Sequence, residues 1–316
     1  MFGKPLNPSS VKDILVISLS NIGDVVLICP VIDVLLRDFT SASVHVIVGP
    51  KASSLLEGHP RLHVIVYDKH MPWPDQCRWF LGLRRERFDL IVDLRNTVLP
   101  FLLNARARTW PQIMPIQGHL RQKHLDRLRS VHPFSDENAP PKAIVPQPVS
   151  DGVTPAGQFA VIASSAADSA KRWTVEGFAQ AADFIAGKGM AVVFTGGDGD
   201  RQRIDDIRRR MKNPSLSLAG QLNLRELAFV LGKARFAVVH DSGAMHIAGY
   251  VHTPVIALFG PTDEKESGPQ DPRSAVVRRN AHCPRCLDPG ARRVAHQCMA
   301  AIQAQDVIDA IQTKFF

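Results

Sequence analysis

The sequence of 316 residues lacks any run of about 18 apolar residues, the length needed to cross a bilayer as a helix. The residues before its first apolar run, 1–12, do not resemble a signal peptide, so we expect a cytoplasmic protein. Aromatic residues are few, with two Tyr and four Trp available for stacking on bases. This scarcity argues against a nucleic-acid-binding protein, a class that the high pI near 9.5 would otherwise suggest.

Several catalytic motifs are missing too. The chain contains no G-x-x-x-x-G-K-[ST], no G-x-S-x-G and no H-E-x-x-H, and Gly196-Gly197-Asp198-Gly199 does not match G-x-G-x-x-G. The sequence therefore gives no sign of a P-loop nucleotide hydrolase, a nucleophile-elbow hydrolase or a zinc protease.

Positive charge is present in excess and is unevenly spread. The formal net charge is +8, and residues 78–129 hold eleven Lys and Arg against four Asp and Glu. A local field of this size attracts an anionic partner, such as nucleic acid, a membrane surface or a phosphorylated substrate. A solvated helical face would carry the same charges, so the pattern alone leaves both interpretations open.

Strands and helices alternate along the chain, which predicts parallel sheets of the α/β class. Strands are expected at 13–19, 44–48, 64–67, 90–94, 159–163, 191–195, 236–240 and 254–259. Helices are expected at 25–39, 174–187, 200–211, 224–234, 241–249 and 306–316.

A proline-rich stretch, 135–157, separates the two halves and is interpreted as a linker. We expect an N-terminal domain, 1–150, a C-terminal domain, 151–300, and a final helix within 301–316 that could pack back on the N-terminal domain. Two doubly wound sheets of this kind would face each other across a cleft, and ligands bind at the carboxyl ends of such strands.

Asp24 lies just after the first expected strand, beside Gly23, which allows a sharp turn. It could cap the following helix. It could instead act as a general base that takes a proton from a substrate hydroxyl.

Two further segments follow strands in the second half. Lys171-Arg172-Trp173 offers a cation to a phosphate, or else two surface cations flanking a packed Trp. Asp241-Ser242-Gly243-Ala244-Met245-His246 joins small residues to a helix start, where backbone N–H groups and the helix dipole favour an anion, and His246 adds a donor. A capped helix with a core histidine is the alternative for this second segment.

Three cysteines, Cys283, Cys286 and Cys298, lie near the C-terminus, the first two in a C-x2-C spacing typical of metal sites. No second pair follows, so we predict reduced thiols or a labile disulfide rather than a bound metal, and keep the three as weak metal candidates.

Taken in order, these segments resemble the ADP-heptose:lipopolysaccharide heptosyltransferases of glycosyltransferase family 9, which have the GT-B fold. The resemblance rests on ILVISLSNIGDVVLICPVIDVLL from Ile14, AKRWTVEGFAQAADFI from Ala170, and LAGQLNLRELAFVLGKARFAVVHDSGAMHIAGYVHTPVIALFGPTD from Leu218. It implies two Rossmann-like domains and inverting heptosyl transfer from ADP-heptose to a lipopolysaccharide inner-core acceptor, with no cofactor and no catalytic metal.

The resemblance also implies roles for single residues. Asp24 matches the family's catalytic base, and the match places the following in the nucleotide-sugar site: Lys171, Thr195, Asp241, Ser242, Gly243 and His246. The basic stretch is the expected contact for the acceptor and for the anionic inner-membrane surface, with Arg106, Arg121 and Lys123 as its weakest assignments.

The chain departs from the family in two places. Ser242 stands where the family usually has Thr, which keeps a small hydroxyl side chain, and three terminal cysteines stand where one branch usually has four. Residues 95–157 have no clear match, so the acceptor is least determined. A same-family transferase with a protein or another glycan as acceptor, and a nucleotide-sugar epimerase on a similar fold, are the alternatives.

Overall fold

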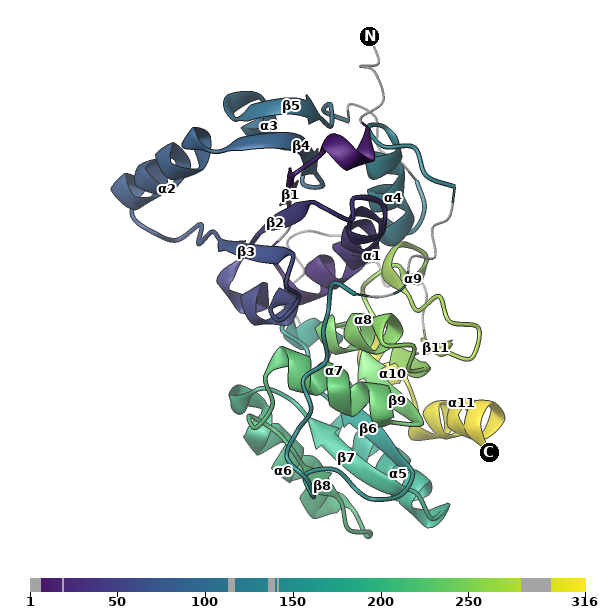
Figure 1. The fold of residues 1–316 in the computed structure, drawn as a ribbon. Coiled ribbons are helices and arrows are strands. Elements are labelled where there is room, and N and C mark those ends of the chain that lie inside the picture. The colour runs from purple at the N-terminus through teal and green to yellow at the C-terminus, as the bar shows by residue number, and fades with distance from the viewer. Residues whose placement is uncertain (1–6, 19, 113–116, 136–139, 141, 280–296) are drawn as a thin grey trace. The chain divides into compact units, whose positions relative to one another are not determined.

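The computed structural model describes residues 7–18, 20–112, 117–135, 140, 142–279 and 297–316 (Figure 1). The chain divides into two compact units, Met1–Val145 and Pro146–Phe316. Each unit is built around its own parallel sheet. Within the described residues, no helix combines the length and apolar character that a membrane crossing needs.

The first unit contains a five-stranded sheet in the order β3-β2-β1-β4-β5, with every pair parallel. Its described elements, with 3-10 helices as η, are η1 (Pro8–Ser10), β1 (Asp13–Ile17), α1 (Ile22–Asp38), β2 (Ser43–Val48), η2 (Pro50–Leu56), β3 (Leu62–Val66), α2 (Trp73–Arg85), β4 (Arg87–Asp93), α3 (Leu99–Leu102), β5 (Asn104–Arg108) and α4 (Leu120–Arg129).

The central strand β1 of this unit is covered on both faces, as its continuous apolar run predicts. Leu15 and Ile17 pack with Leu83 of α2. Helix α1 contacts β2, and α4 packs on α1. Because β1 and β4 are neighbours but not consecutive, the chain reverses direction across the sheet between them, and their carboxyl ends mark the switch point where ligands bind in such sheets.

The second unit contains a six-stranded parallel sheet in the order β11-β10-β9-β6-β7-β8. Its described elements are β6 (Phe159–Ala163), η3 (Ser169–Lys171), α5 (Val175–Gly187), β7 (Ala191–Thr195), η4 (Asp198–Asp200), α6 (Arg201–Arg210), β8 (Leu216–Ser217), α7 (Leu224–Lys233), β9 (Phe236–His240), α8 (Gly243–Tyr250), β10 (Val255–Leu258), α9 (Glu264–Ser267), β11 (Ala275–Val277), α10 (Gln297–Ala301) and α11 (Ala304–Phe315). The switch point of this sheet lies between β6 and β9.

Helix α11 buries its apolar side in the core of the second unit, whereas the sequence suggested that it could pack back on the N-terminal domain. Val307 and Ile311 lie in that core. The Phe315 ring stacks on Phe236 of β9, with centroids 4.1 Å apart. The helix packs on α5 and β11. A run of apolar residues at helical spacing needs a buried partner, and this sheet face supplies it.

The junction between the units is short and fixed on either side. The buried carboxylate of Asp33 in α1 accepts the backbone N–H groups of Lys142 and Ala143, each at 2.8 Å. Four residues after Ala143, the N–H of Gln147 donates to the carbonyl of Arg225 in the second unit, at 3.1 Å. The chain therefore passes from one unit to the other within residues 144–146.

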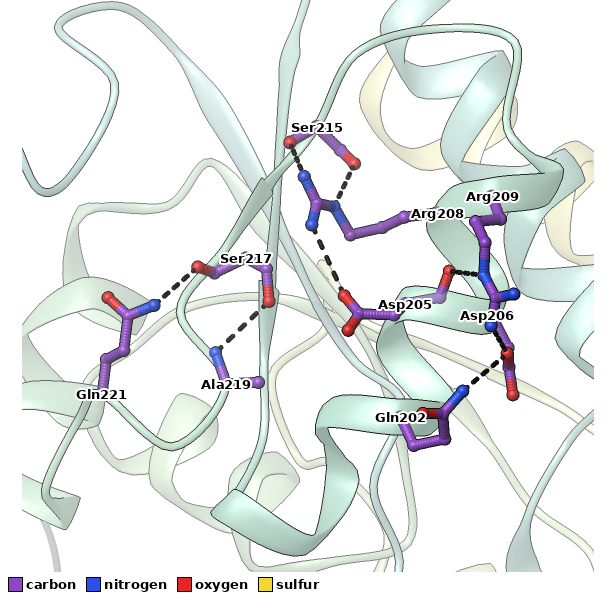
Figure 2. A network of polar contacts seen from close by, with 9 residues as sticks. All are labelled: Gln202, Asp205, Asp206, Arg208, Arg209, Ser215, Ser217, Ala219 and Gln221. Carbon is purple, nitrogen blue, oxygen red and sulfur yellow. Dashed lines mark hydrogen bonds and ion pairs between the residues drawn. The ribbon is translucent and has the colours of Figure 1, made fainter.

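The edge strand β8 is tied to α6 by side chains (Figure 2). Arg208 donates to both the hydroxyl and the carbonyl oxygen of Ser215, at 3.2 and 2.9 Å, and also lies 3.6 Å from Asp205. Arg209 pairs with Asp206. The arginines at the end of this helix are thus largely neutralised by acidic residues one turn earlier, as on an ordinary solvated helix face.

Candidate functional site

The switch point of the second sheet carries a pair of opposite charges. Lys171 follows β6 on a short 3-10 turn, and Asp241 directly follows β9, so adjacent strands deliver both side chains to one edge. The Lys171 Nζ lies 2.6 Å from Asp241 Oδ2. The Nε2 of His246 lies 4.0 Å from the other carboxylate oxygen. The structure therefore brings together three residues that the sequence assigns to the nucleotide-sugar site.

Helix α8 begins at this pair. Ser242 occupies its N-cap position in an extended conformation, but its side chain makes no capping hydrogen bond. The Ser242 Oγ is buried and has no partner among the described residues. Gly243 is the first helical residue, so no side chain shields the backbone there. The positive end of the helix and a buried hydroxyl together suit a negatively charged group.

Four more buried hydroxyls lie at the carboxyl ends of the strands. Ser164 and Ser165 follow β6, Thr195 ends β7, and Thr262 follows β10. Each has a side-chain oxygen that is buried without a hydrogen-bond partner in the described part of the chain. Buried polar atoms are nearly always satisfied in folded proteins, so a row of unsatisfied hydroxyls along one edge makes this edge a candidate site for a polar ligand.

Sequence reasoning placed Thr195 in this site but missed Ser164, Ser165 and Thr262 as members. The available signal was position, because all three follow strands of the parallel sheet within four residues. Small hydroxyl residues are common in exposed loops, and only burial separates a ligand contact from a solvated turn.

His240, the last residue of β9, holds the segments of the site in place. Its Nε2 accepts the backbone N–H of Trp173 at 2.9 Å, and its Nδ1 faces the Ser165 carbonyl at 3.4 Å. The ring therefore carries its proton on Nδ1. Burial lowers the pKa of His240 to about 3, so the imidazole stays neutral.

Trp173 is a core residue, and this explains its place beside Lys171. Its ring is buried and its Nε1 donates to the Ile302 carbonyl at 2.8 Å. The backbone carbonyl of Trp173 accepts from Arg203. The packed-Trp interpretation and the cation interpretation of this segment are compatible, since the buried ring fixes the turn that carries Lys171.

Asp24 lies in the first turn of α1, after β1 of the first sheet. The capping interpretation of this residue is wrong, because Asn21 occupies the N-cap position. Instead the Asn21 amide donates to Asp24 Oδ2 at 2.9 Å. Among the described residues, this side-chain bond is the one that orients the Asp24 carboxylate.

His124 of α4 lies close enough to Asp24 to feel its charge. Burial lowers the pKa of His124 to about 4, and Asp24 opposes the shift only in part. The Nε2 of this neutral ring is buried with no partner among the described residues. Sequence reasoning missed His124, because nothing in its helix sets it apart from a core histidine.

A buried network fixes the loop after β4, next to β1. The Asp93 carboxylate accepts the backbone N–H groups of Arg95 and Thr97 and the Thr97 hydroxyl. Arg127 of α4 donates to the Asp93 carbonyl and to Asn96 Oδ1, each at 3.1 Å. These bonds fix the loop after β4 beside the switch point, and they could not be predicted from the sequence.

The three expected acceptor contacts lie in two elements. Arg106 is exposed on the edge strand β5, with its guanidinium 3.4 Å from the Ser10 hydroxyl. Arg121 and Lys123 are half-buried in α4, the helix that packs on α1 and carries His124. Of the three, only Arg121 and Lys123 therefore lie on the same helix as His124, the residue whose pKa is affected by Asp24.

Of the three cysteines, Cys283 and Cys286 lie outside the described residues. Cys298 is buried in the core of the second unit beside Met299. Among the described residues there is no group of three or more His, Cys, Asp or Glu side chains that could hold a metal ion.

The model of glycosyltransferase family 9 (heptosyltransferase) matches residues 119–293, more than half of the chain. The chain belongs to glycosyltransferase family 9. The curated relatives of this glycosyltransferase include lipooligosaccharide heptosyltransferase 2 of Haemophilus influenzae, 33% identical over 113 residues. That match spans 34% of the chain and 33% of the relative. Lipopolysaccharide heptosyltransferase 3 of Escherichia coli is 25% identical over 76% of the chain and 81% of its own length.

Solved structures show the same fold for the family 9 chain. A family 9 glycosyltransferase from Veillonella parvula matches with a TM-score of 0.77 at 18% identity, covering 98% of both chains. E. coli heptosyltransferase WaaC with ADP matches with a TM-score of 0.72 at 17% identity, covering 96% of this chain and 99% of that one. The predicted pair of parallel-sheet α/β domains, as in the GT-B fold, is confirmed.

Proposed function

We propose that this family 9 glycosyltransferase moves a heptose from ADP-heptose to the inner core of lipopolysaccharide, with inversion and without a catalytic metal. The observation that carries the proposal is the edge of the second sheet, where the pair of half-buried Lys171 and buried Asp241, the start of α8 and a row of unsatisfied hydroxyls lie. The E. coli and H. influenzae relatives named above support the sugar and the acceptor class.

The nucleotide diphosphate would bind at this edge. Lys171 and the first turn of α8, with Ser242 and Gly243, would meet the phosphates, and His246 would add a donor. Thr195 and the serines after β6 would satisfy the remaining oxygens. These groups would stabilise the charge that develops on ADP as it leaves, and because they are already in place the reaction needs little reorganisation.

Asp24 would act as the general base. The acceptor hydroxyl would lose its proton to this carboxylate while its oxygen attacks the anomeric carbon opposite the leaving ADP. The Asn21 amide supports this role by fixing the orientation of the carboxylate. Arg121, Lys123 and Arg106 would hold anionic groups of the acceptor.

The acceptor is attached to a lipid, so we propose that the enzyme works at the cytoplasmic face of the inner membrane. Residues 78–129 contain eleven basic and four acidic residues. This local excess of positive charge supports contact with an anionic surface.

Two substitutions with opposite kinetic signatures test the assignment. Asp24→Asn should lower the transfer rate at least about 100-fold, since a general base typically contributes that much. It should leave the affinity for ADP unchanged. Lys171→Met should weaken ADP binding by roughly 10- to 100-fold, because it removes a charge-assisted contact. Transfer to truncated lipopolysaccharide would be followed by mass spectrometry, and ADP binding by calorimetry.

Asp75→Asn is the matched control, because Asp75 also lies in the first turn of a helix in the first unit and pairs only with Arg78 among the described residues. It should change neither quantity. An Asp24→Asn enzyme that keeps more than about a tenth of the normal rate would refute the base assignment. Transfer to a protein or another glycan, but not to lipopolysaccharide, would redirect the acceptor within the family.

A further inference from the structure

Large apolar side chains are exposed on the first unit around α3. Val98, Phe101, Leu102 and Trp110 all reach solvent, from 38% for Phe101 to 72% for Val98. The Phe101 and Trp110 rings lie 5.4 Å apart, so α3 and the segment after β5 form one surface. We call these four residues the α3 patch. Clustered exposure of this kind marks an interaction site, whereas single exposed apolar residues do not.

The rim of the α3 patch is basic. The Arg108 guanidinium lies 5.7 Å from the centre of the Phe101 ring and donates to the Pro100 carbonyl at 2.7 Å. Arg95 and Arg106 are exposed nearby in sequence. Between Asp93 and Asp126 the chain contains no acidic residue at all.

The acidic residues that border this stretch do not offset the charge. Asp93 is buried and accepts hydrogen bonds from the loop after β4, and Asp126 pairs with Arg129 at 2.7 Å. The basic end of α6 provides a contrast, because Arg208 and Arg209 have acidic partners one turn away (Figure 2).

Part of the α3 patch lies at the same edge of the sheet as Asp24. Val98 comes five residues after the end of β4, Trp110 comes two residues after the end of β5, and the turn to Asp24 follows β1. These three strands are neighbours and run parallel, so their carboxyl ends share one edge. At a strand spacing of about 4.8 Å, the ends of β1 and β5 lie roughly 10 Å apart.

We propose that the α3 patch docks on the interface of an anionic lipid bilayer. Trp and Phe rings settle at the level of the headgroups, while arginines at the rim meet the lipid phosphates. A second copy of the chain is a poorer partner, because its own Arg95 and Arg108 would face like charges. Docking at this edge would bring Asp24 to the membrane side, which gives the proposal its role in the proposed function.

Vesicle binding tests the proposal on the full chain. The protein should co-sediment with vesicles of phosphatidylglycerol and phosphatidylethanolamine. It should not co-sediment with vesicles of phosphatidylcholine alone. The double variant Phe101→Ser/Trp110→Ser should bind the anionic vesicles at least about tenfold more weakly, since it removes two interfacial rings. Raising the salt to 0.5 M should weaken binding by the normal protein about tenfold or more.

Leu216→Ser/Phe316→Ser is the matched control, because it removes two exposed apolar side chains from the second unit. Circular dichroism must show that both variants are folded, and Val98→Ser/Leu102→Ser is the second pair if the first is not. Vesicle binding that is equal for the normal protein and both patch variants would overturn the proposal. A dimer that the patch variants dissociate, without vesicle binding, would assign the patch to a second copy and also overturn it.

Transfer to a soluble, lipid-free inner-core oligosaccharide separates this proposal from the proposed function. The patch variant should keep its rate on this acceptor and lose rate only on acceptor embedded in vesicles. Loss of rate on the soluble acceptor with unchanged vesicle binding would mean that the patch holds the sugar, and would refute docking. If the normal protein transfers nothing, the proposed function fails, and the sedimentation result still decides the docking proposal.

Discussion

Two buried threonines in the second unit differ in whether their hydroxyl groups make a hydrogen bond. Thr195 and Thr253 are both almost fully buried. The Thr253 hydroxyl donates to the Leu231 carbonyl at 2.7 Å, whereas the Thr195 hydroxyl has no partner among the described residues. An unsatisfied hydroxyl contributes nothing to the stability of the free protein, so its presence at the strand end fits the proposed role of Thr195 in holding a ligand.

Thr195→Val should therefore separate stability from binding. The free protein should be as stable as before, or more stable, because an unsatisfied polar atom is replaced by a methyl group of the same shape. ADP affinity should fall by several-fold. Thr253→Val, the control, should lower the free energy of unfolding by about 1–3 kcal/mol and leave ADP affinity unchanged. Chemical denaturation and calorimetry measure both, and a Thr195→Val protein with normal ADP affinity would remove Thr195 from the site.

His240 makes stability depend on pH. Its pKa is about 3 in the fold, because it is buried and lies near Arg203 and Arg172, against about 6.5 in the unfolded chain. The unfolded chain then binds the extra proton first, so stability is full above pH 6.5 and falls as the pH drops toward 3. Between pH 7 and pH 4 this amounts to about 3 kcal/mol.

His240→Gln should flatten this dependence in denaturation curves, since Gln can still accept the Trp173 N–H but does not titrate. His124, with its pKa lowered to about 4, should leave a residual slope from the first unit. Equal slopes in the normal and His240→Gln proteins would contradict the assignment.

The positions of site residues could be predicted where a strand end decides them, and their roles remain proposals. Asp24, Lys171 and Asp241 follow strands, so the sequence placed them at the sheet edges before the structure did. His124 and His240 differ from ordinary core histidines only in what surrounds them, which depends on contacts between segments far apart in sequence. The sequence left Asp24 undecided between a helix cap and a general base, and the structure shows Asn21 at the cap position instead.

At the scale of elements, the buried strands were predictable and the polar ones were not. The strands expected at 159–163, 191–195 and 236–240 agree with β6, β7 and β9 to the residue, because buried parallel strands are continuous apolar runs. Thr174 caps α5, accepting from the Gly177 N–H. Strand β5 was missed, since Asn-Ala-Arg-Ala-Arg at a sheet edge has no apolar run. The helix α4 was missed for the same lack of an apolar pattern.

The first turn of α5 contains Gly177, and the absence of a side chain there leaves room for the Trp173 ring. A Cβ at Gly177 would lie 2.4 Å from the Trp173 ring, which is buried beneath the turn that carries Lys171. Gly177→Ala should therefore lower the free energy of unfolding by about 1–3 kcal/mol, despite the better helix propensity of Ala.

Gly187→Ala, at the other end of α5, is the control. A Cβ there would have no neighbour within 4 Å, so the protein should gain up to about 1 kcal/mol. Urea denaturation of both variants measures the difference. A Gly177→Ala protein that is as stable as Gly187→Ala would show that the Trp173 ring has room to move.

At the scale of the whole molecule, the proposed donor site belongs to one unit. Lys171, Asp241 and the unsatisfied hydroxyls gathered around them all lie in Pro146–Phe316, whose sheet has its own core. Residues 146–316 expressed alone should therefore fold and bind ADP with an affinity close to that of the full chain, while residues 1–145 should bind none. Calorimetry on both fragments measures this. A folded 146–316 fragment that fails to bind ADP would mean that the first unit supplies part of the donor site.

The stacking of Phe315 on Phe236 also bears on how the chain folds as it is synthesised. The ribosome releases β6, β7 and β9 well before α11, so the sheet face that this helix covers is exposed on the nascent chain until α11 follows. The first unit has its sheet and its core residues within Met1–Val145, all of which are synthesised earlier. We therefore expect the second unit to complete its core later than the first, with an apolar sheet face exposed until α11 is released.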